Sequence, residues 1–148
     1  MASTSAAVTA WESLFRAQVG VMRTLAAEFP TDLLSLNEYD VLFNLSVQPD
    51  RRARLRDIND LVLISQPSVS RLVDKLTRRG LVAKCPDEND GRGTIVRLTD
   101  EGYALYRQVA LQHVKVISRV MTIELDDEDL STLTAITDRI SSGLRPRT

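Results

Sequence analysis

The sequence of 148 residues contains one cysteine, one histidine and one tryptophan, and these shortages exclude several classes of protein. Cys85 alone can form no disulfide within the chain and cannot build a cysteine-based metal site. His113 alone leaves no histidine-rich zinc site, so we expect neither a metal nor a cofactor. No serine-histidine-aspartate spacing, phosphate-binding loop or carboxylate pair stands out, and we therefore do not expect an enzyme.

Long hydrophobic runs are also missing. Apolar runs such as residues 61–64 are far shorter than the roughly 20 residues that a membrane-spanning helix needs. The first five residues carry no basic side chain ahead of the apolar positions, unlike a secretory signal. We expect a cytoplasmic protein that does not interact with a membrane.

The formal net charge of −1 hides an uneven distribution of charge along the chain. Residues 51–98 contain eleven lysines and arginines and six acidic residues, a surplus of +5, while the remainder carries −6. A basic middle between acidic flanks is typical of a protein with one face for a polyanion such as nucleic acid. An evenly solvated surface is the alternative, because residues close in the sequence often scatter in space.

Apolar periodicity predicts a mainly helical chain. We expect helices over about residues 5–29, 36–48, 55–63, 65–79 and 99–124, and a last helix from residue 126. In the second helix we expect Tyr39, Leu42, Phe43 and Leu45 to point inward. Residues 81–85 and 94–98 predict two short strands, joined by a polar loop whose Asp90-Gly91 pair is typical of a turn.

The fourth helix has the clearest pattern. Ser65 is a candidate N-cap, Pro67 fits the first turn, and Gly80 is placed to end the helix. Its inward stripe consists of Val69, Leu72, Val73 and Leu76. The opposite side carries Arg71, Asp74, Lys75 and Arg78, with Ser68 and Ser70 on the flanks. This helix therefore has one apolar face and one polar, largely basic face.

The order of three helices followed by a hairpin is that of a winged helix-turn-helix. In such a fold a helix presents polar side chains to base edges in the major groove, while the hairpin, or wing, reaches the neighbouring groove. We expect a mainly α fold with a small β-hairpin wing and additional helices at both termini.

Several segments together resemble the MarR-type transcriptional regulators, over nearly the whole chain. The matching segments are residues 65–73, Leu76 and residues 79–82 of the fourth helix and first strand, then Asp87, Asp90, Gly91, Arg92, residues 96–99 and residues 101–102 of the wing and the following helix. No one of these segments is specific, but their joint order and spacing are.

The resemblance implies how the chain is organised. Residues 1–30 and 100–148 would form a helical dimerisation region, and residues 31–99 the winged helix-turn-helix. The homodimer would bind an inverted-repeat DNA operator, usually as a repressor that a small ligand or an oxidant releases. A winged helix that binds protein instead of DNA is the alternative, and a titration of DNA binding against salt discriminates between the two.

The residues that we expect to contact DNA lie mainly on the fourth helix and the wing: Gln66, Ser68, Ser70, Arg71, Lys75, Arg78, Arg92 and Arg54. The resemblance implies that Arg92 enters the minor groove, and Asp90 either braces the wing loop or pairs with Arg92. Lys75 and Arg78 fit phosphate contacts better than base contacts, because phosphate contacts predominate in such interfaces. Arg54 contacts phosphate or belongs to a solvated loop. We expect Asp74 to form a helix ion pair with Arg78.

A pocket for a small aromatic or phenolic effector is a further candidate site. Trp11, Phe15, Tyr39 and His113 could line it, although an aromatic stripe of this kind is more often simple core. Cys85 on the first wing strand fits an inert strand residue better than a redox switch. The oxidant-sensing regulators carry their cysteine in the first helix, where this chain has none.

Overall fold

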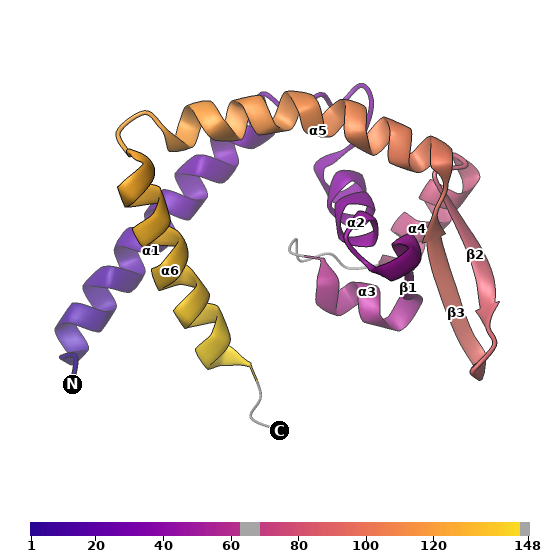
Figure 1. Ribbon diagram of the computed structural model, residues 1–148, viewed down its shortest axis with the longest axis horizontal. Coiled ribbons are helices and arrows are strands. Elements are labelled where there is room, and N and C mark those ends of the chain that lie inside the picture. The colour runs from indigo at the N-terminus through magenta and orange to yellow at the C-terminus, as the bar shows by residue number, and fades with distance from the viewer. Residues whose placement is uncertain (63–68, 146–148) are drawn as a thin grey trace. The chain divides into compact units, whose positions relative to one another are not determined.

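The computed structural model describes residues 1–62 and 69–145, and within them the elements follow the expected order. The helices are α1 (Thr4–Ala27), α2 (Leu36–Ser46), the 3-10 turn η1 (Pro49–Arg51), α3 (Leu55–Leu61), α4 (Val69–Arg78), α5 (Asp100–Met121) and α6 (Asp127–Leu144). The strands are β1 (Arg52–Arg54), β2 (Val82–Asp87) and β3 (Asp90–Leu98). Figure 1 shows their arrangement. The predicted fold class, mainly α with a small wing, is confirmed.

The wing is a three-stranded antiparallel sheet of order β1-β3-β2, not a two-stranded hairpin. Residues 52–54, which the sequence suggests to be an arginine-rich connection, form β1 along the free edge of β3, with Ala53 opposite Val96. A strand of three residues is too short to show an alternation of apolar and polar residues, so the sequence does not predict it. Strand β1 forms because β3 supplies its hydrogen-bonding partners. The sheet therefore joins the segment before α3 to the wing.

Side-chain caps lie at the starts of α2 and α5, where the sequence predicts helices to begin; the expected N-cap Ser65 and first-turn Pro67 lie outside the described residues. Ser35 accepts a hydrogen bond from the Glu38 amide, and Glu38 accepts one from the Ser35 amide, so both bonds of a capping box are present at α2. Thr99 caps α5 in a similar way, because its hydroxyl accepts from the Gly102 amide and donates to the Gly80 carbonyl. Gly80 adopts φ +74°, a left-handed conformation that suits a glycine after the end of α4.

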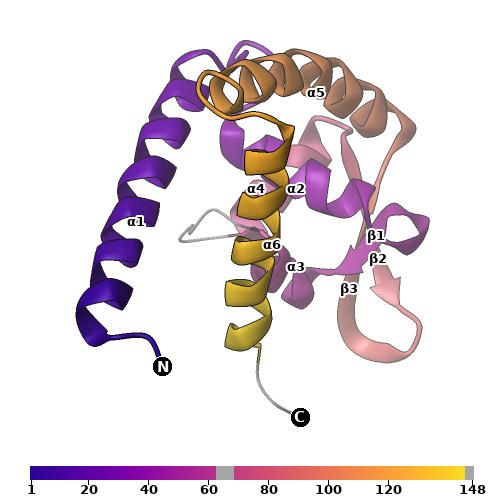
Figure 2. The same ribbon diagram turned by 60° about the vertical axis from the view of Figure 1, so that its left-hand side comes forward.

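Residues 26–113 form one compact unit with its own core. Figures 1 and 2 show α2, α3 and α4 grouped beside the sheet. Fully buried core side chains come from each of these elements: Leu42, Leu45, Ile58, Val73, Leu76 and Val96. The predicted inward position of Phe43 is wrong: its side chain is 37% exposed, and Val41 is buried instead.

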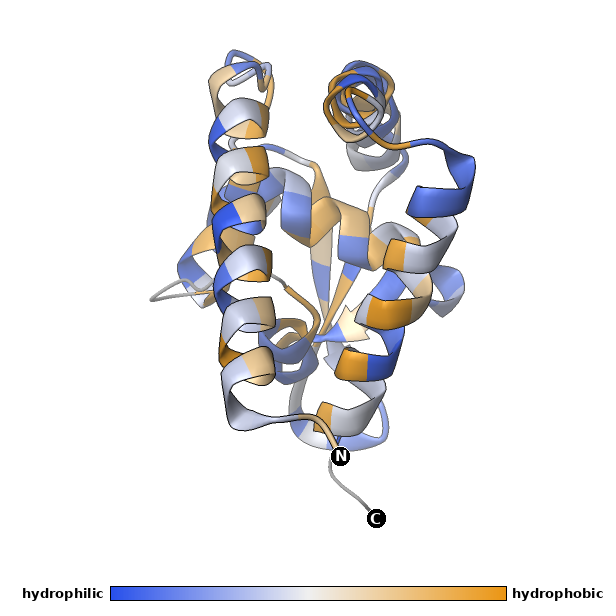
Figure 3. Ribbon diagram, turned by 90° about the vertical axis from the view of Figure 1, so that its left-hand side faces the viewer, coloured by the Kyte–Doolittle hydropathy of each residue, from blue (hydrophilic) through white to orange (hydrophobic). Residues whose placement is uncertain are grey.

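Residues 1–25 and 114–148 form the other unit. Of the described residues in α6 none is buried, and Leu25 is the buried residue of α1. Hydrophobic positions recur along both helices (Figure 3). The described helices include none long and apolar enough to cross a membrane.

Candidate nucleic-acid interface

A depression of about 460 Å³ lies between α3, the start of α4 and the wing. We call it the wing depression; its lining residues are Arg54, Leu55, Arg56, Asn59, Ser70, Asp90, Arg92, Gly93 and Thr94. Three of these residues are arginines and one is acidic. The wing depression thus combines a cationic lining with hydrogen-bonding groups from both the wing and α4, which suits a phosphate backbone.

The wing presents Arg92 from an irregular stretch of β3. The turn between β2 and β3 is Glu88-Asn89, so the predicted turn at Asp90-Gly91 and the predicted long loop are wrong. The β2–β3 pairing shifts between Pro86 and Asp87, and residues 91–93 bulge out between the two registers. Arg92 lies in this bulge between two glycines, not at the tip of the hairpin, and is exposed.

Asp87 anchors the wing from inside, which the sequence does not reveal. Its side chain is 5% exposed, and Oδ2 lies 2.8 Å from Arg54 Nε. The alignment at that oxygen is not that of a hydrogen bond, so we describe the contact as a close ion pair. The Asn89 amide donates to Oδ1 at 3.0 Å, and a Cβ on Gly93 would lie 3.1 Å from the Asp87 Cβ. One buried carboxylate therefore holds β1, the turn and the bulge together.

Asp90 lies beside the bulge. Its Oδ1 accepts a hydrogen bond from the Arg92 amide at 3.2 Å, and its Oδ2 is 3.7 Å from Arg56 Nη1. These contacts involve the backbone of Arg92 and the side chain of Arg56. The predicted role of Asp90 as a wing brace is compatible with them and stays a prediction.

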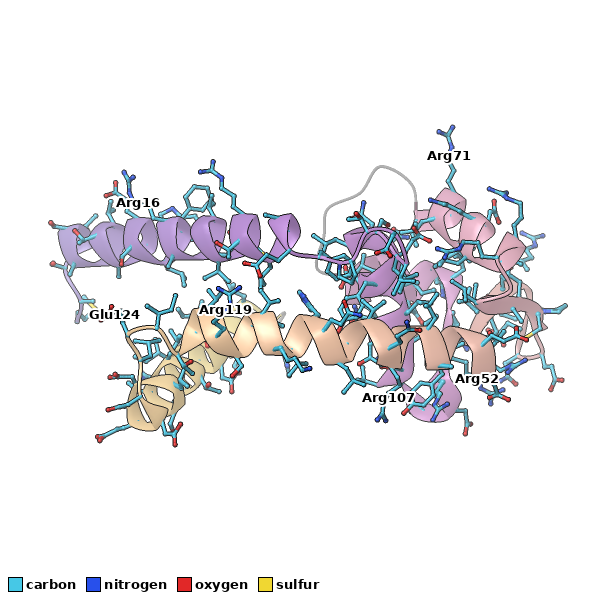
Figure 4. All side chains as sticks on the ribbon, turned by 90° about the horizontal axis from the view of Figure 1, so that it is seen from above. Arg16, Arg52, Arg71, Arg107, Arg119 and Glu124 are labelled. Atoms are coloured by element: carbon cyan, nitrogen blue, oxygen red, sulfur yellow. The ribbon has the colours of Figure 1, made fainter. Side chains whose placement is uncertain are left out.

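The polar face of α4 is exposed at Ser70, Arg71 and Arg78. Figure 4 shows the Arg71 side chain extending away from α4. The expected contacts of Gln66 and Ser68 lie outside the described residues. Contacts of the other α4 residues with DNA remain predictions.

Two charged residues of α4 have partners elsewhere in the same unit. Lys75 Nζ lies 3.4 Å from Glu38 Oε1 of α2, although its side chain stays 56% exposed. Asp74 pairs with Lys84 of β2, and the hydrogen bond from Lys84 lowers the pKa of the Asp74 carboxyl. The predicted pair between Asp74 and Arg78 is therefore wrong, because β2 places a lysine closer to that carboxylate.

Glu38 connects the start of α2 with the end of α4. Its carboxylate accepts hydrogen bonds from Arg79 Nη1 and from Lys75 Nζ, and Arg79 Nη2 donates to the Leu33 carbonyl at 2.8 Å. Burial on its own raises the pKa of Glu38, but the hydrogen bonds from Ser35 and Arg79 more than offset it, so this pKa lies below its ordinary value. An ionised, well-satisfied carboxylate thus fixes the position of α4 against α2.

Tyr39 and His113, two of the expected effector residues, contact each other. Their ring centroids are 5.2 Å apart, and Phe29 lies 5.2 Å from His113 and 5.5 Å from Tyr39. Burial raises the pKa of Tyr39 to about 12 and lowers that of His113, which favours the neutral form of both. The other two expected residues, Trp11 and Phe15, belong to the unit of residues 1–25 and 114–148, with centroids 5.4 Å apart and exposures of 58% and 52%. A pocket shared by all four stays a prediction.

A strained corner precedes β1. Asp50 and Arg51 adopt φ values of 55° and 52°, both left-handed. The Arg51 guanidinium lies 3.5 Å from the centre of the Tyr103 ring, and Arg107 donates a hydrogen bond to the Tyr103 hydroxyl, which lowers the pKa of that phenol. Stacking of Arg51 on the tyrosine of α5 holds the corner in place.

Among the described residues, no group of three or more candidate metal ligands comes together. Cys85 is exposed on β2, opposite Ile95 of β3. A helix with an exposed polar face, packed beside a wing whose bulge carries an arginine, defines a winged helix-turn-helix protein.

Comparison with known proteins identifies the family. A MarR-family model matches residues 34–93. PecS, an HTH-type transcriptional regulator from Dickeya dadantii, is 29% identical over 134 residues that cover 89% of this chain and 80% of PecS. The solved structure of Sco3205, a MarR regulator from Streptomyces coelicolor in complex with DNA, is 26% identical with a TM-score of 0.80, and covers 99% of this chain and 92% of that one.

A second similar solved structure concerns regulation of DNA binding of Bordetella bronchiseptica BpsR by 6-hydroxynicotinic acid. It is 22% identical with a TM-score of 0.77, covers 90% of this chain and 98% of that one, and at this identity shows the fold alone. Taken together, the comparisons show that the chain belongs to the MarR family of winged helix-turn-helix, DNA-binding transcriptional regulators. The expectation of a regulator rather than an enzyme is confirmed by this family.

Proposed function

We propose that this MarR-family protein is a homodimeric repressor that binds an inverted-repeat operator and is released by a small aromatic ligand. The observation that carries the proposal is the wing depression, which brings Arg54, Arg56 and Arg92 beside Ser70 of α4. Guanidinium groups match the bidentate geometry of phosphate, so a DNA strand that leaves the groove read by α4 would meet such groups where α3 and the wing adjoin α4.

A second copy of the chain is the partner that we assign to the unit of residues 1–25 and 114–148. Large apolar side chains are exposed along its helices: Val8, Trp11, Phe15, Val114, Ile136, Ile140 and Leu144. Monomeric proteins rarely expose so many large apolar side chains without a partner. Dimerisation through these helices would remove them from water, in line with the dimerisation region expected over residues 1–30 and 100–148.

Two-fold symmetry of the dimer would determine the form of the operator. Two equivalent recognition helices require two equivalent half-sites, about 10 base pairs apart, so that both helices enter successive major grooves. The predicted contacts of Ser70, Arg71 and Arg78 would lie in these grooves, with Arg92 in the adjoining minor groove. Since bacterial DNA lies in the cytoplasm, we assign the action of the protein to that compartment.

The effector that we propose is a small aromatic or phenolic molecule. Tyr39 and His113 support this choice, because both are neutral aromatic side chains with a polar atom that can orient a phenol or an aromatic acid. BpsR, a protein of the same fold, responds to an aromatic acid. Release from DNA by such a compound would make the protein a ligand-responsive repressor.

Selection of bound DNA from a random pool tests the proposal most directly. We expect a palindromic consensus, an affinity that falls steeply with salt, and a dimer in sedimentation at micromolar concentration. An asymmetric single half-site, or a stable monomer, would refute the dimeric repressor. Binding that is insensitive to salt, or no DNA binding at all, would refute the assigned DNA interface and favour a protein-binding adaptor.

A further inference from the structure

We propose that Arg56 is the arginine of the wing depression that binds backbone phosphate, and that Arg54 is instead a positioning residue that holds the wing through Asp87. The inference rests on the proposed function and deepens it, because it divides the arginines of one DNA-binding depression between two roles. The sequence alone gives these two arginines, two residues apart, the same chemistry.

Arg56 has the freedom that a phosphate contact requires. Its side chain is 64% exposed and lines the wing depression together with that of Arg92. The acidic groups near it are Asp57 and Asp90, with closest atoms at 3.9 and 3.7 Å, beyond hydrogen-bond distance. Exposed pairs of this length stabilise a protein by about 1 kcal/mol at most, so a phosphate can displace them.

The position of Arg56 in α3 makes this role directly testable. Arg56 is the second residue of that helix, where a cation is unfavourable against the positive end of the helix dipole. Replacement of Arg56 by alanine therefore removes no favourable interaction with the helix dipole, so a loss of DNA affinity in that variant would report on the phosphate contact.

Arg54 is committed to a different partner. Its Nε lies 2.8 Å from Oδ2 of Asp87, and the Asp87 side chain is almost completely buried. A buried carboxylate that loses its cation is strongly unfavourable, so this pair does not exchange readily for a phosphate. Since Arg54 belongs to β1 and Asp87 ends β2, the pair ties the two outer strands of the sheet across β3.

The Arg54–Asp87 pair matters for DNA binding because of the bulge that it supports. Arg92 has glycines on both sides, and Gly93 packs closely against Asp87. Glycine allows many backbone conformations, so the bulge depends on its contacts for a defined shape. Loss of the pair should therefore leave the bulge without a fixed conformation, so that the Arg92 side chain no longer has a defined orientation.

The salt dependence of DNA binding separates a phosphate contact from a positioning role. We would titrate a duplex of about 30 base pairs, long enough for two half-sites, with wild type, Arg56→Ala and Arg54→Ala. Arg56→Ala should weaken binding about tenfold and reduce the slope of log affinity against log salt by about 0.9 for each bound protomer. Arg54→Ala should weaken binding about 2- to 10-fold, because Arg92 must then be ordered on binding, without a change of slope.

Arg52→Ala is the matched control. Arg52 lies on the same strand two residues before Arg54, is exposed, and does not line the wing depression. We expect its slope and affinity to stay near the wild-type values.

Asp87→Asn gives the sharpest outcome, because simple electrostatics predicts the opposite result. On charge alone, removal of a negative charge beside DNA would raise the affinity for DNA. Our inference predicts that loss of the pair with Arg54 lowers the affinity to that of Arg54→Ala. The double variant Arg54→Ala/Asp87→Asn should then show no further loss. Amide hydrogen exchange on the free protein should be faster in residues 88–93 for both variants, with the core of residues 26–113 unchanged. Arg56→Ala should leave this exchange as in wild type.

Each other outcome overturns the inference. A reduced slope in Arg54→Ala, an unchanged slope in Arg56→Ala, or tighter binding by Asp87→Asn would each refute the division of roles. In these cases wild type still binds DNA, so the proposed function survives. Failure of wild type to bind any duplex refutes the proposed function and the inference together.

Discussion

Replacement of Gly102 by alanine should destabilise the protein, although alanine is the better helix former. Gly102 lies in the first turn of α5, where an added Cβ would be 1.9 Å from the Leu81 carbonyl oxygen and 2.9 Å from Leu98 Cδ1. Contacts of Cβ atoms under 3.0 Å are essentially never observed, so α5 and the Leu81 backbone must move apart by about 1 Å. The clash therefore falls on the backbone, which yields less easily than a flexible side chain.

The expected magnitude follows from three contributions. Alanine in place of glycine favours a helix by about 1 kcal/mol. Overpacking costs about 1–3 kcal/mol, and the hydrogen bond that Leu81 accepts from the Thr99 amide, worth about 1 kcal/mol, is lost when the backbone moves. The net loss is about 2 kcal/mol, which lowers the unfolding midpoint by about 4–8 °C in a chain of this size.

Thermal unfolding at one fixed protein concentration measures the effect, since a dimer unfolds at a midpoint that depends on concentration. Gly20→Ala is the matched control: Gly20 lies inside α1, and nothing lies within 4 Å of an added Cβ. That variant should gain up to about 1 kcal/mol, so the two substitutions should act in opposite directions. An unfolding midpoint of Gly102→Ala at or above that of wild type would refute the argument.

Three further predictions concern DNA binding, assembly and pH. Arg92→Ala should weaken binding to every duplex by about 1–3 kcal/mol. Arg71→Ala should relax specificity at one base pair of each half-site if Arg71 reads a guanine, or weaken binding uniformly and reduce the salt slope by about one if it contacts phosphate; affinities for single-base variants of the selected operator at two salt concentrations check both variants. Ile136→Asp should turn the dimer into a monomer or unfolded chain in sedimentation and abolish operator binding, because it charges an exposed apolar position of α6 that we assign to the interface. Burial lowers the pKa of His113, so the unfolded chain takes up a proton at a higher pH than the folded chain. The contribution of His113 to the free energy of unfolding should therefore be complete above about pH 6.5, and should decrease as the pH falls from there to the lower pKa of His113 in the folded chain. Urea unfolding curves at several pH values measure this decrease, which should be smaller in His113→Phe.

Local signals in the sequence were sufficient to predict where most of the helices begin and end. The Ser35 capping box, Thr99 at the start of α5 and Gly80 after α4 each depend on residues within four positions of one another. Such short-range chemistry operates before any tertiary contact forms, so a sequence reveals it. The order of the elements and the family followed from the same kind of information.

Tertiary contacts explain two of the predictions that failed. Asp74 has Arg78 one helical turn away, yet it pairs with Lys84, which only the packing of β2 beside α4 brings near. Strand β1 exists because β3 has a free edge, which the spacing of neighbouring residues does not encode. The error at Phe43 is of another kind, because the buried positions 38, 41, 42 and 45 follow the ordinary i, i+3, i+4, i+7 pattern of a helix, from which Phe43 is absent.

The wing anchor was missed for a related reason. Asp87 is one of three acidic residues in a polar segment, and nothing in that segment distinguishes the buried one. The expected helix over residues 55–63 already places Arg56 in a different element from Arg54. What the sequence does not show is the pairing of β1 with β3, and the contact of Arg54 with Asp87 depends on that sheet.

The left-handed corner at Asp50 and Arg51 has a consequence for the engineering of this regulator. Each residue holds a backbone conformation that L-amino acids adopt at a cost of roughly 1–2 kcal/mol, and aspartate bears it better than arginine does. Asp50→Gly would remove the conformational free-energy cost at residue 50, because glycine adopts positive φ freely. It would lose little beyond an exposed ion pair with Arg52 at 3.6 Å. Arg51 is the residue to leave in place, because its stacking on Tyr103 fastens the first strand of the wing sheet to α5. The same corner thus contains a position where stability can be added and, next to it, one whose replacement would remove a contact with α5.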